Sequence, residues 1–309
     1  MDNQNEPTHK INWGDVIRRS FEMGPIRPPS EGKDSSLLIR ATRNCPWNRC
    51  LFCSTYKDSR FEYRPVAEIK EDIDVARVLH DEIKAASWKS GLSGRVSNEL
   101  IRAIVQANPE IYLDNGDLPL QNLANIANWT ASGARTLFLQ DADTLIMRTP
   151  ELLQIIRYLE ETFPTIERIT SYARAKAASK KTLQELKDLH EAGLSRLHIG
   201  LESGNDEVLA FMQKGVNQEQ HISGGQKVVA AGISLSEYIM PGLGGKRWSQ
   251  AHALDSARAL SAINPDFIRL RSLIVRRNSI LYDKYLAGEF EPLSEDEFVD
   301  EIALFIENL

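Results

Sequence analysis

The sequence of 309 residues contains only three cysteines, no surplus of positive charge and no long apolar segment. An odd and small number of cysteines excludes a secreted fold held together by a set of disulfides. The formal net charge of −6 provides no general attraction to nucleic acids or to anionic membranes, so neither is expected as a partner. Residues 1–10 carry no apolar signal core, and no stretch approaches the length of a membrane span. Together these absences predict a cytoplasmic protein.

The three cysteines lie in one short stretch of the chain. It reads Arg43-Asn44-Cys45-Pro46-Trp47-Asn48-Arg49-Cys50-Leu51-Phe52-Cys53, with the spacing C-x4-C-x2-C. A structural zinc site normally has four protein ligands, and the sequence offers no fourth cysteine. A [4Fe–4S] cluster held by three cysteines keeps one iron open for a small molecule. Two alternatives remain: zinc completed by a distant histidine, or a set of reduced core cysteines.

The apolar run Leu37-Leu38-Ile39 leads into this loop, and an aromatic residue, Phe52, precedes the last cysteine. These features resemble the radical S-adenosylmethionine (radical SAM) superfamily, whose usual loop is C-x3-C-x2-C. The chain departs from that pattern by one extra residue between the first two cysteines. The resemblance implies that Cys45, Cys50 and Cys53 hold one [4Fe–4S] cluster per chain, with Phe52 beside the cofactor. It also implies an oxygen-sensitive enzyme that cleaves S-adenosylmethionine to a 5′-deoxyadenosyl radical, which abstracts hydrogen from a substrate.

Apolar periodicity predicts an α/β fold with strands and helices in alternation. The expected strands are 36–42, 136–139, 166–172, 196–201, 233–240 and 267–273, and the expected helices are 66–86, 93–106, 118–129, 150–162, 179–192, 205–213, 218–231 and 249–262. Such alternation is typical of a parallel sheet with right-handed crossovers. We therefore expect a partial (β/α)6, TIM-like barrel over 36–275, interrupted by a helical insertion at about 87–132. An N-terminal arm (1–35) and a C-terminal helical extension (276–309) would flank it, the latter with Phe298, Ile302, Phe305, Ile306 and Leu309 on one apolar face.

Polar residues follow the predicted strands at the end where ligands bind in such folds. Gln140, Asp141 and Asp143 come after the second strand, where the superfamily receives the amino group of the methionine moiety. An acidic cap on the next helix, by Asp143 or Thr144, is an equal alternative. Ser171 and Arg174 end the third strand, and the planar guanidinium of Arg174 suits either a carboxylate or an ordinary surface ion pair.

The fourth strand carries a second resemblance, in Gly200-Leu201-Glu202-Ser203-Gly204 and Met212-Gln213-Lys214-Gly215. These stretches resemble the branch containing oxygen-independent coproporphyrinogen oxidase, the elongator-type enzymes and the methylthiotransferases. By this resemblance Glu202 contacts the cofactor ribose and Lys214 pairs with the cofactor carboxylate; a helix cap is the alternative for Glu202. On the fifth strand, Tyr238 and Gly242 would lie against the adenine.

The remaining predictions concern the reaction and its partners. Three cysteines exclude a second cysteine-ligated cluster, and no Gly-Lys-Ser/Thr follows the glycines at 242–245, which excludes a phosphate-binding P-loop there. A small-molecule substrate and a flavodoxin- or ferredoxin-type electron donor are expected. Arg269 and Arg271, on one face of the last strand, would bind an anionic substrate or close the barrel. A non-catalytic haem carrier of the same fold and a zinc-binding interaction protein are the competing functions.

Overall fold

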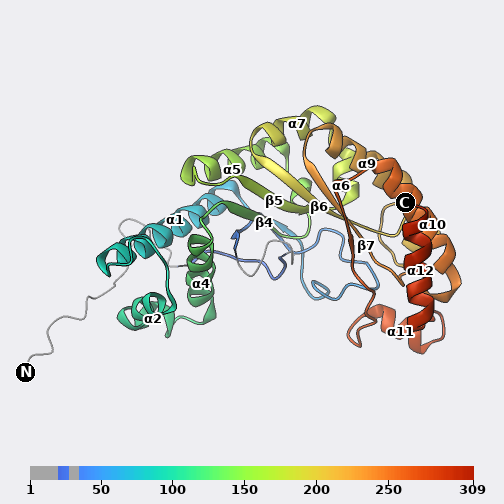
Figure 1. Cartoon of the computed structure of the whole chain (residues 1–309), viewed down its shortest axis with the longest axis horizontal. Coiled ribbons are helices and arrows are strands. Elements are labelled where there is room, and N and C mark those ends of the chain that lie inside the picture. The colour runs from blue at the N-terminus through green and yellow to red at the C-terminus, as the bar shows by residue number, and fades with distance from the viewer. Residues whose placement is uncertain (1–19, 28–34) are drawn as a thin grey trace, which may run out of the picture. The chain divides into compact units, whose positions relative to one another are not determined.

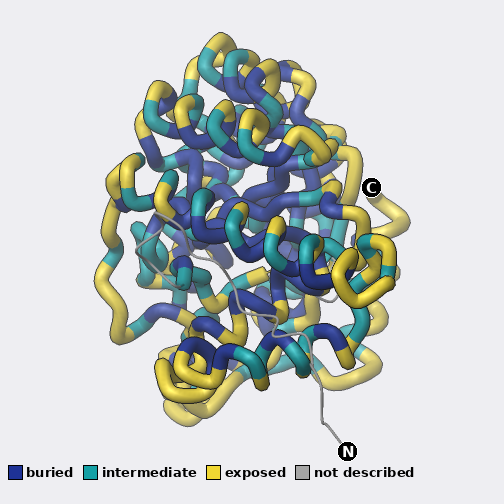
Figure 2. The backbone as a smooth tube through the Cα atoms, turned by 90° about the vertical axis from the view of Figure 1, so that its left-hand side faces the viewer, coloured by how far each residue is buried: buried dark blue, intermediate teal, exposed yellow. Residues whose placement is uncertain are grey.

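The computed structural model describes residues 20–27 and 35–309. Six strands form one sheet in the order β1-β4-β5-β6-β7-β8, so the strands of this sheet are arranged in their order along the chain. The pairs β1–β4, β6–β7 and β7–β8 are parallel. This is the strand order of the predicted partial (β/α)6 barrel, and the α/β prediction is confirmed. Figure 2 shows buried residues along the strands, while most helices alternate between buried and exposed residues.

The chain divides into two compact units. The first comprises the described residues up to Ala41 with Tyr63–Asp141 and Leu153–Thr170, and the second comprises Thr42–Glu62, Ala142–Leu152 and Ser171–Leu309. Three of the described elements, β3 (Glu62–Tyr63), α5 (Thr149–Thr162) and β5 (Arg168–Ala173), have residues in both units. These units come from contacts within the structure, and the domain limits predicted at residues 35 and 275 stay predictions.

The first unit is built on a short parallel strand pair covered by helices. Its elements are β1 (Leu37–Arg40), β4 (Thr136–Gln140), α1 (Val66–Lys89), α2 (Asn98–Ala107), α3 (Pro109–Tyr112) and α4 (Asp117–Ala131) (Figure 1). Leu37 and Ile39 are completely buried because helices α1 and α4 contact β1. The helical insertion predicted between the first helix and the second strand is therefore present as α2, α3 and α4.

The second unit contains the rest of the sheet. Its strands are β6 (Leu194–Glu202), β7 (Ser234–Ile239) and β8 (Phe267–Leu270), and its helices are η2 (Thr144–Ile146, a 3-10 helix), α6 (Ala175–Lys180), α7 (Leu183–Glu191), α8 (Asp206–Phe211), α9 (Gln218–Ala230), α10 (Gly245–Ile263), α11 (Ile280–Leu286) and α12 (Glu295–Glu307). Helix α10 contacts both α9 and α12, and the three lie side by side in Figure 1. A small pair of strands, β2 (Thr42–Arg43) and β3 (Glu62–Tyr63), was not predicted and closes the loop at 44–61 that carries the cysteines.

Several element boundaries differ from the predictions for local reasons. The helix predicted from residue 93 begins at Asn98, because Gly91 and Gly94 adopt positive φ angles and Ser97 provides the cap, its hydroxyl accepting from the N–H of Leu100 (3.2 Å). The helix predicted over 179–192 is two helices, α6 and α7. Thr182 starts the second with a capping box that includes Glu185.

The apolar face predicted for the C-terminal extension is narrower than expected. Phe305 is buried, but Ile306 and Leu309 are 58% and 52% exposed. Successive helical residues point about 100° apart, and the strip of α12 that is buried contains Glu301 and Phe305. The prediction was wrong for Ile306 and Leu309 because it assigned every apolar residue to one face. None of the described helices is long and apolar enough to cross a membrane.

Candidate cluster and cofactor site

Two asparagines shape the cysteine loop. Asn44 and Asn48 have φ angles of 68° and 51°, a left-handed conformation that asparagine tolerates better than most residues. The Asn44 amide donates to the carbonyl of Arg60 (2.6 Å), and the Asn48 amide donates to the carbonyls of Tyr56 and Ser59. The Asn48 backbone N–H points at the sulfur of Cys45 (3.4 Å). The loop is thus folded back on itself by local hydrogen bonds.

The same loop is fastened to the turn that follows α8. The Trp47 indole N–H donates to the carbonyl of Gln213 (2.6 Å), and the Leu51 N–H donates to the carbonyl of Met212 (3.0 Å). The Trp47 ring lies against Gly215, whose φ of 72° and missing Cβ make room for it. Because Lys214 belongs to this turn, the cysteines and Lys214 are positioned by one set of contacts within the second unit.

All three cysteines are half-buried free thiols. Burial raises the pKa of the Cys50 thiol, the positive charges of Lys214 and Arg174 lower it, and the sulfurs of Cys45 and Cys53 raise it. The three sulfurs therefore lie close enough to influence one another, beside two cations. Within the described residues, no group of three ligating side chains is arranged around a common metal position. The donor set itself, three thiols with cations that favour the thiolate form, is of the kind that iron–sulfur clusters use.

Glu202 and Lys214 form an ion pair at the end of β6. The pairing of β6 with β7 shifts between Gly200 and Glu202, so that an additional residue is accommodated there, and Glu202 has a φ of 63°. A bulge of this kind redirects a side chain and is frequent beside functional sites. The Lys214 Nζ lies 3.2 Å from Glu202 Oε1. A Cβ on Gly200 would collide with the Glu202 carboxylate, so the glycine gives the pair its space.

Asp143, Ser171 and Arg174 lie in the same unit, and each takes part in hydrogen bonds there. The Arg174 guanidinium donates to the carbonyl of Lys214 (2.7 Å), and its backbone N–H donates to Asp143 Oδ1 (3.1 Å). Ser171 and Thr144 share a hydrogen bond between their hydroxyls (2.6 Å). Burial raises the pKa of Asp143 to about 7. Asp143 occupies the position before η2, but its side chain caps no N–H of that helix. The alternative of a helix cap by the Asp143 side chain is therefore wrong.

Gln140 and Asp141 belong to the first unit, where their side chains are used to hold the segment 20–27. The Gln140 amide accepts from the Gly24 N–H (2.8 Å) and donates to the carbonyls of Gly24 and Ile26. Asp141 accepts two hydrogen bonds from Arg40, at 3.0 and 2.7 Å. The structure thus gives both side chains structural partners, and their predicted contact with the cofactor stays a prediction.

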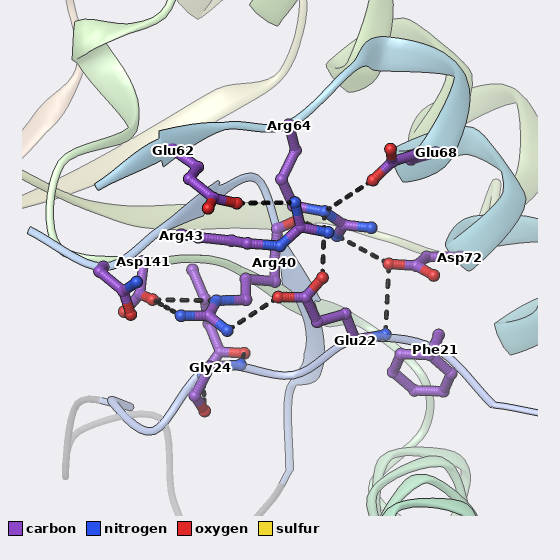
Figure 3. Close-up of polar contacts among 12 residues, drawn as sticks. Phe21, Glu22, Gly24, Arg40, Arg43, Glu62, Arg64, Glu68, Asp72 and Asp141 are labelled. Carbon is purple, nitrogen blue, oxygen red and sulfur yellow. Dashed lines mark hydrogen bonds and ion pairs between the residues drawn. The ribbon is translucent and has the colours of Figure 1, made fainter. Parts of the chain in front are cut away.

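Figure 3 shows the charged network that continues from Arg40. The Glu22 carboxylate lies between the guanidinium groups of Arg40 (2.8 Å) and Arg64 (3.4 Å). Arg64 also pairs with Asp72 on α1 (2.7 Å), and the side chains of this pair are 1% and 0% exposed. The segment 20–27 of the predicted N-terminal arm is thereby fixed to α1 and β1, and residues 1–19 and 28–34 of that arm lie outside the described residues.

Tyr238 and Gly242 lie on β7 and in the turn after it. The Gly242 N–H donates to Glu301 of α12 (2.6 Å), and the Tyr238 ring lies 5.7 Å from the ring of His198. His198 is in turn 5.7 Å from the ring of Tyr172 on β5. Trp47, Tyr172 and His198 were not predicted as site residues. His198 stands between the apolar residues Leu197 and Ile199 of β6, and this alternation predicts that it faces the opposite side of the sheet.

Comparison with known proteins gives a family and a set of distant relatives. The model of the family "Radical SAM superfamily" matches residues 107–257, a range that begins after the cysteine loop. A "tRNA uridine(34) acetyltransferase" of Methanocaldococcus infernus is 24% identical over 282 residues, which are 90% of this chain and 50% of the relative. The protein of the same name from Methanocaldococcus jannaschii is 23% identical over 39% of this chain and 22% of its own length. The chain spans half or less of the length of these curated relatives.

Two solved structures are similar to the chain at low sequence identity. The archaeal Elp3 of Methanocaldococcus infernus is 18% identical, with a TM-score of 0.45 over 55% of this chain and 44% of that one. Coproporphyrinogen III oxidase (HemN) from Escherichia coli is 16% identical, with a TM-score of 0.46 over 55% and 39%. The family match stands together with the strand order and the cysteine loop described above. Residues 107–257, about half of the chain, thus match the radical SAM superfamily.

Proposed function

We propose that this chain binds one [4Fe–4S] cluster through Cys45, Cys50 and Cys53 and cleaves S-adenosylmethionine reductively. The observation that carries the proposal is the fastening of the cysteine loop to the turn with Lys214, which sets three sulfurs beside two cations. When bound, the cluster would supply the electron and the open iron site from which a 5′-deoxyadenosyl radical is generated for hydrogen abstraction.

The chain's own residues would bind and orient the cofactor. Lys214 and Arg174 provide positive charge next to Cys50, which favours thiolate ligands and attracts a carboxylate. The bulge in β6 directs Glu202 to the same place. In the role proposed for it, Lys214 would exchange Glu202 for the cofactor carboxylate, leaving Glu202 to accept from the ribose hydroxyls. Asp143, Ser171, Tyr238 and Gly242 would complete the site from the ends of their strands.

The test is anaerobic reconstitution with iron and sulfide, reduction, and addition of S-adenosylmethionine. We expect 5′-deoxyadenosine, detected by mass spectrometry, from the wild-type protein. The Cys50→Ala variant should give none, while Ser54→Ala, a neighbouring substitution that removes no sulfur, should retain the product. Deoxyadenosine formation that survives Cys50→Ala would contradict the proposal.

The electron donor would dock beside Trp47. The guanidinium carbons of Arg49 and Arg174 and the Nζ of Lys176 lie 5.1, 5.3 and 5.6 Å from the centre of the Trp47 ring. Positive charge around a ring next to the cysteines suits the acidic surface of a flavodoxin- or ferredoxin-type protein. The double variant Arg49→Gln/Lys176→Gln should slow deoxyadenosine formation with flavodoxin but not with dithionite. Equal slowing with both reductants would place the defect in the cofactor site instead.

A second candidate function is the modification of tRNA. The relatives are named tRNA uridine(34) acetyltransferases, so the prediction that nucleic acid is not a partner is not confirmed by the comparisons. Against it stands the net charge of −6. Binding of tRNA, measured by filter retention at low and moderate salt, would decide: affinity that falls steeply with salt indicates contacts with phosphates, and absence of binding at low salt rules this function out for the chain.

A further inference from the structure

One face of strands β6, β7 and β8 carries arginine and aromatic side chains where a core sheet would carry apolar ones. The register pairs Arg196 with Ser234, and Tyr238 with Arg269. Paired residues of parallel strands point to the same side of the sheet. His198 joins this face through its ring contacts with Tyr172 and Tyr238. The opposite face of β6, with Leu197, Ile199 and Leu201, is completely buried and apolar.

The arginines on this face are held in place by neutral groups. The Arg269 Nε–H donates to the Ser236 hydroxyl (2.9 Å), and the Arg196 Nε–H donates to the Ser234 hydroxyl (3.3 Å). Both guanidinium groups lie near the ring of Phe267, at 4.6 Å for Arg196 and 5.7 Å for Arg269. These contacts fix the direction of the two guanidinium groups, and the groups that hold Arg269 carry no negative charge.

Among the residues that the structure describes, no carboxylate lies within ion-pair distance of Arg269 or Arg271. A guanidinium group has five N–H donors, and the Ser236 hydroxyl uses one donor of Arg269. Arg269 is partly buried, and a partly buried charge without a counter-ion is costly in free energy. An anionic ligand would offset that cost, and a surface ion pair, the common role of an arginine at a sheet end, is absent here.

Two tyrosine hydroxyls lie beside these arginines. Burial raises the pKa of Tyr172, and the neighbouring hydroxyl of Tyr238 raises it further, while Arg271 acts in the opposite direction and Glu202 also raises it. Tyr172 is therefore within electrostatic reach of Tyr238, Arg271 and Glu202, and both its hydroxyl and that of Tyr238 belong to the end of the sheet where Glu202 and Lys214 pair. The arginine face and the proposed cofactor site are continuous within the second unit.

We propose that this face binds the substrate, and that the substrate is an organic anion with at least two acidic groups on a flat or apolar body. Arg269 lies on β8, and Arg271 follows the end of that strand, where its N–H donates to the carbonyl of Ile239 (3.0 Å). Alternate residues of an extended segment lie about 7 Å apart, a spacing for two separate carboxylate or phosphate groups. The Tyr172–His198–Tyr238 row and the 40% exposed ring of Phe267 offer the surface for the body. The inference rests on the proposed function, because it assigns the substrate class to that enzyme's site.

Binding can be measured apart from the radical chemistry. The probe is trimesate, a flat aromatic tricarboxylate, titrated by anaerobic calorimetry into the reconstituted protein, with its uncharged triamide as the control ligand. We expect trimesate to bind and the triamide not to bind. Arg269→Gln and Arg271→Gln should each weaken trimesate binding about tenfold, the effect of one charge-assisted contact. The matched control is Arg258→Gln, which makes the same charge change on α10, where Arg258 pairs with Asp255.

The outcomes separate this inference from the proposed function. Arg271 is exposed, so Arg271→Gln tests the site even if Arg269→Gln fails to fold. The control variant Arg258→Gln should still cleave S-adenosylmethionine with dithionite at the wild-type rate. Failure of trimesate to bind, or weakening by Arg258→Gln equal to that by Arg271→Gln, overturns the anion site while leaving cofactor cleavage intact. Arginine-dependent binding in a protein that forms no deoxyadenosine overturns the proposed function and supports the anion site.

Discussion

Gly215 is the residue on which the position of the cysteine loop depends most directly. Its φ is 72°, and an added Cβ would collide with the Trp47 ring. Gly215→Ala should lower the free energy of unfolding by about 2–4 kcal/mol, from backbone strain plus displacement of the ring. It should also lower the iron retained after reconstitution, because the ring anchors the cysteines. Urea unfolding and iron analysis measure the two effects.

A matched glycine separates strain from collision. Gly288 has the same φ of 72° and no atom within 4 Å of an added Cβ, and it lies in the same unit. Gly288→Ala should lower the free energy of unfolding by only about 1 kcal/mol, because backbone strain is its only effect. Iron retention should be unchanged. Equal costs for the two variants would show that the Trp47 contact does not matter.

Asp143 gives the protein a specific pH dependence. Burial raises its pKa to about 7, above the value near 4 of an unfolded chain. Its contribution to stability is therefore fully present below about pH 4 and is lost as the pH rises through 7. Asp143→Asn keeps an oxygen to accept from the Arg174 N–H and removes the titration. The variant should be more stable than the wild type at pH 8 by about 1–2 kcal/mol, measured by urea unfolding. At about pH 3.5, where the carboxyl is protonated in both the folded and the unfolded wild-type protein, the two proteins should be nearly equal. A variant that is less stable at pH 8 would contradict the assignment.

At the scale of elements, the described part of the arm is held to α1 by buried charges. Asp72 and Arg64 form an ion pair that is essentially inaccessible to solvent, and Asp72 also accepts from the Glu22 N–H (3.2 Å). Removing one partner of such a pair leaves an uncompensated buried charge, so Asp72→Ala should lower the free energy of unfolding by about 3–5 kcal/mol. It should also open the segment 20–27 to limited proteolysis.

The exposed pair on the same helix provides the control. Arg77 Nε lies 2.6 Å from Asp81 Oδ2, and the two side chains are 45% and 52% exposed. Exposed ion pairs of this kind contribute at most about 1 kcal/mol to the free energy of unfolding. Asp81→Ala should leave both stability and proteolysis nearly unchanged. If Asp72→Ala behaved in the same way, the buried network would not fix the arm.

For the whole molecule, the decisive experiment compares variants that lose binding of the iron–sulfur cluster with variants that lose binding of S-adenosylmethionine. Glu202→Ala removes the partner of Lys214 and no cysteine, so iron content should stay at the wild-type level while S-adenosylmethionine binding weakens about tenfold or more. Cys50→Ala should lose the cluster itself. Loss of iron in Glu202→Ala would show that this carboxylate supports the cluster and does not contact the ribose.

Much of the architecture could be predicted from sequence because strand and helix periodicity are local properties. The six strands of the sheet and the alternation of helices follow from apolar spacing, and the structure contains them. The small strands β2 and β3 could not be predicted, because each has only two residues and the alternation of apolar and polar residues cannot be recognised over so short a segment. The exposed side of α12 was misjudged because a helix sequence does not say which neighbour covers it.

The sequence by itself determined the candidate cluster ligands and the class of fold. Three sulfurs within nine residues can come together through the conformation of one short loop. The alternation of strands and helices is compatible with only a few sheet topologies. Only the tertiary structure decided which distant groups meet: Trp47 on Gly215, Glu22 between Arg40 and Arg64, and the arginine face with its tyrosines. The reason is physical, since these contacts join segments that are far apart in the sequence. The arginine face also depends on strand register, because a shift of one residue would turn each of its side chains to the other face of the sheet.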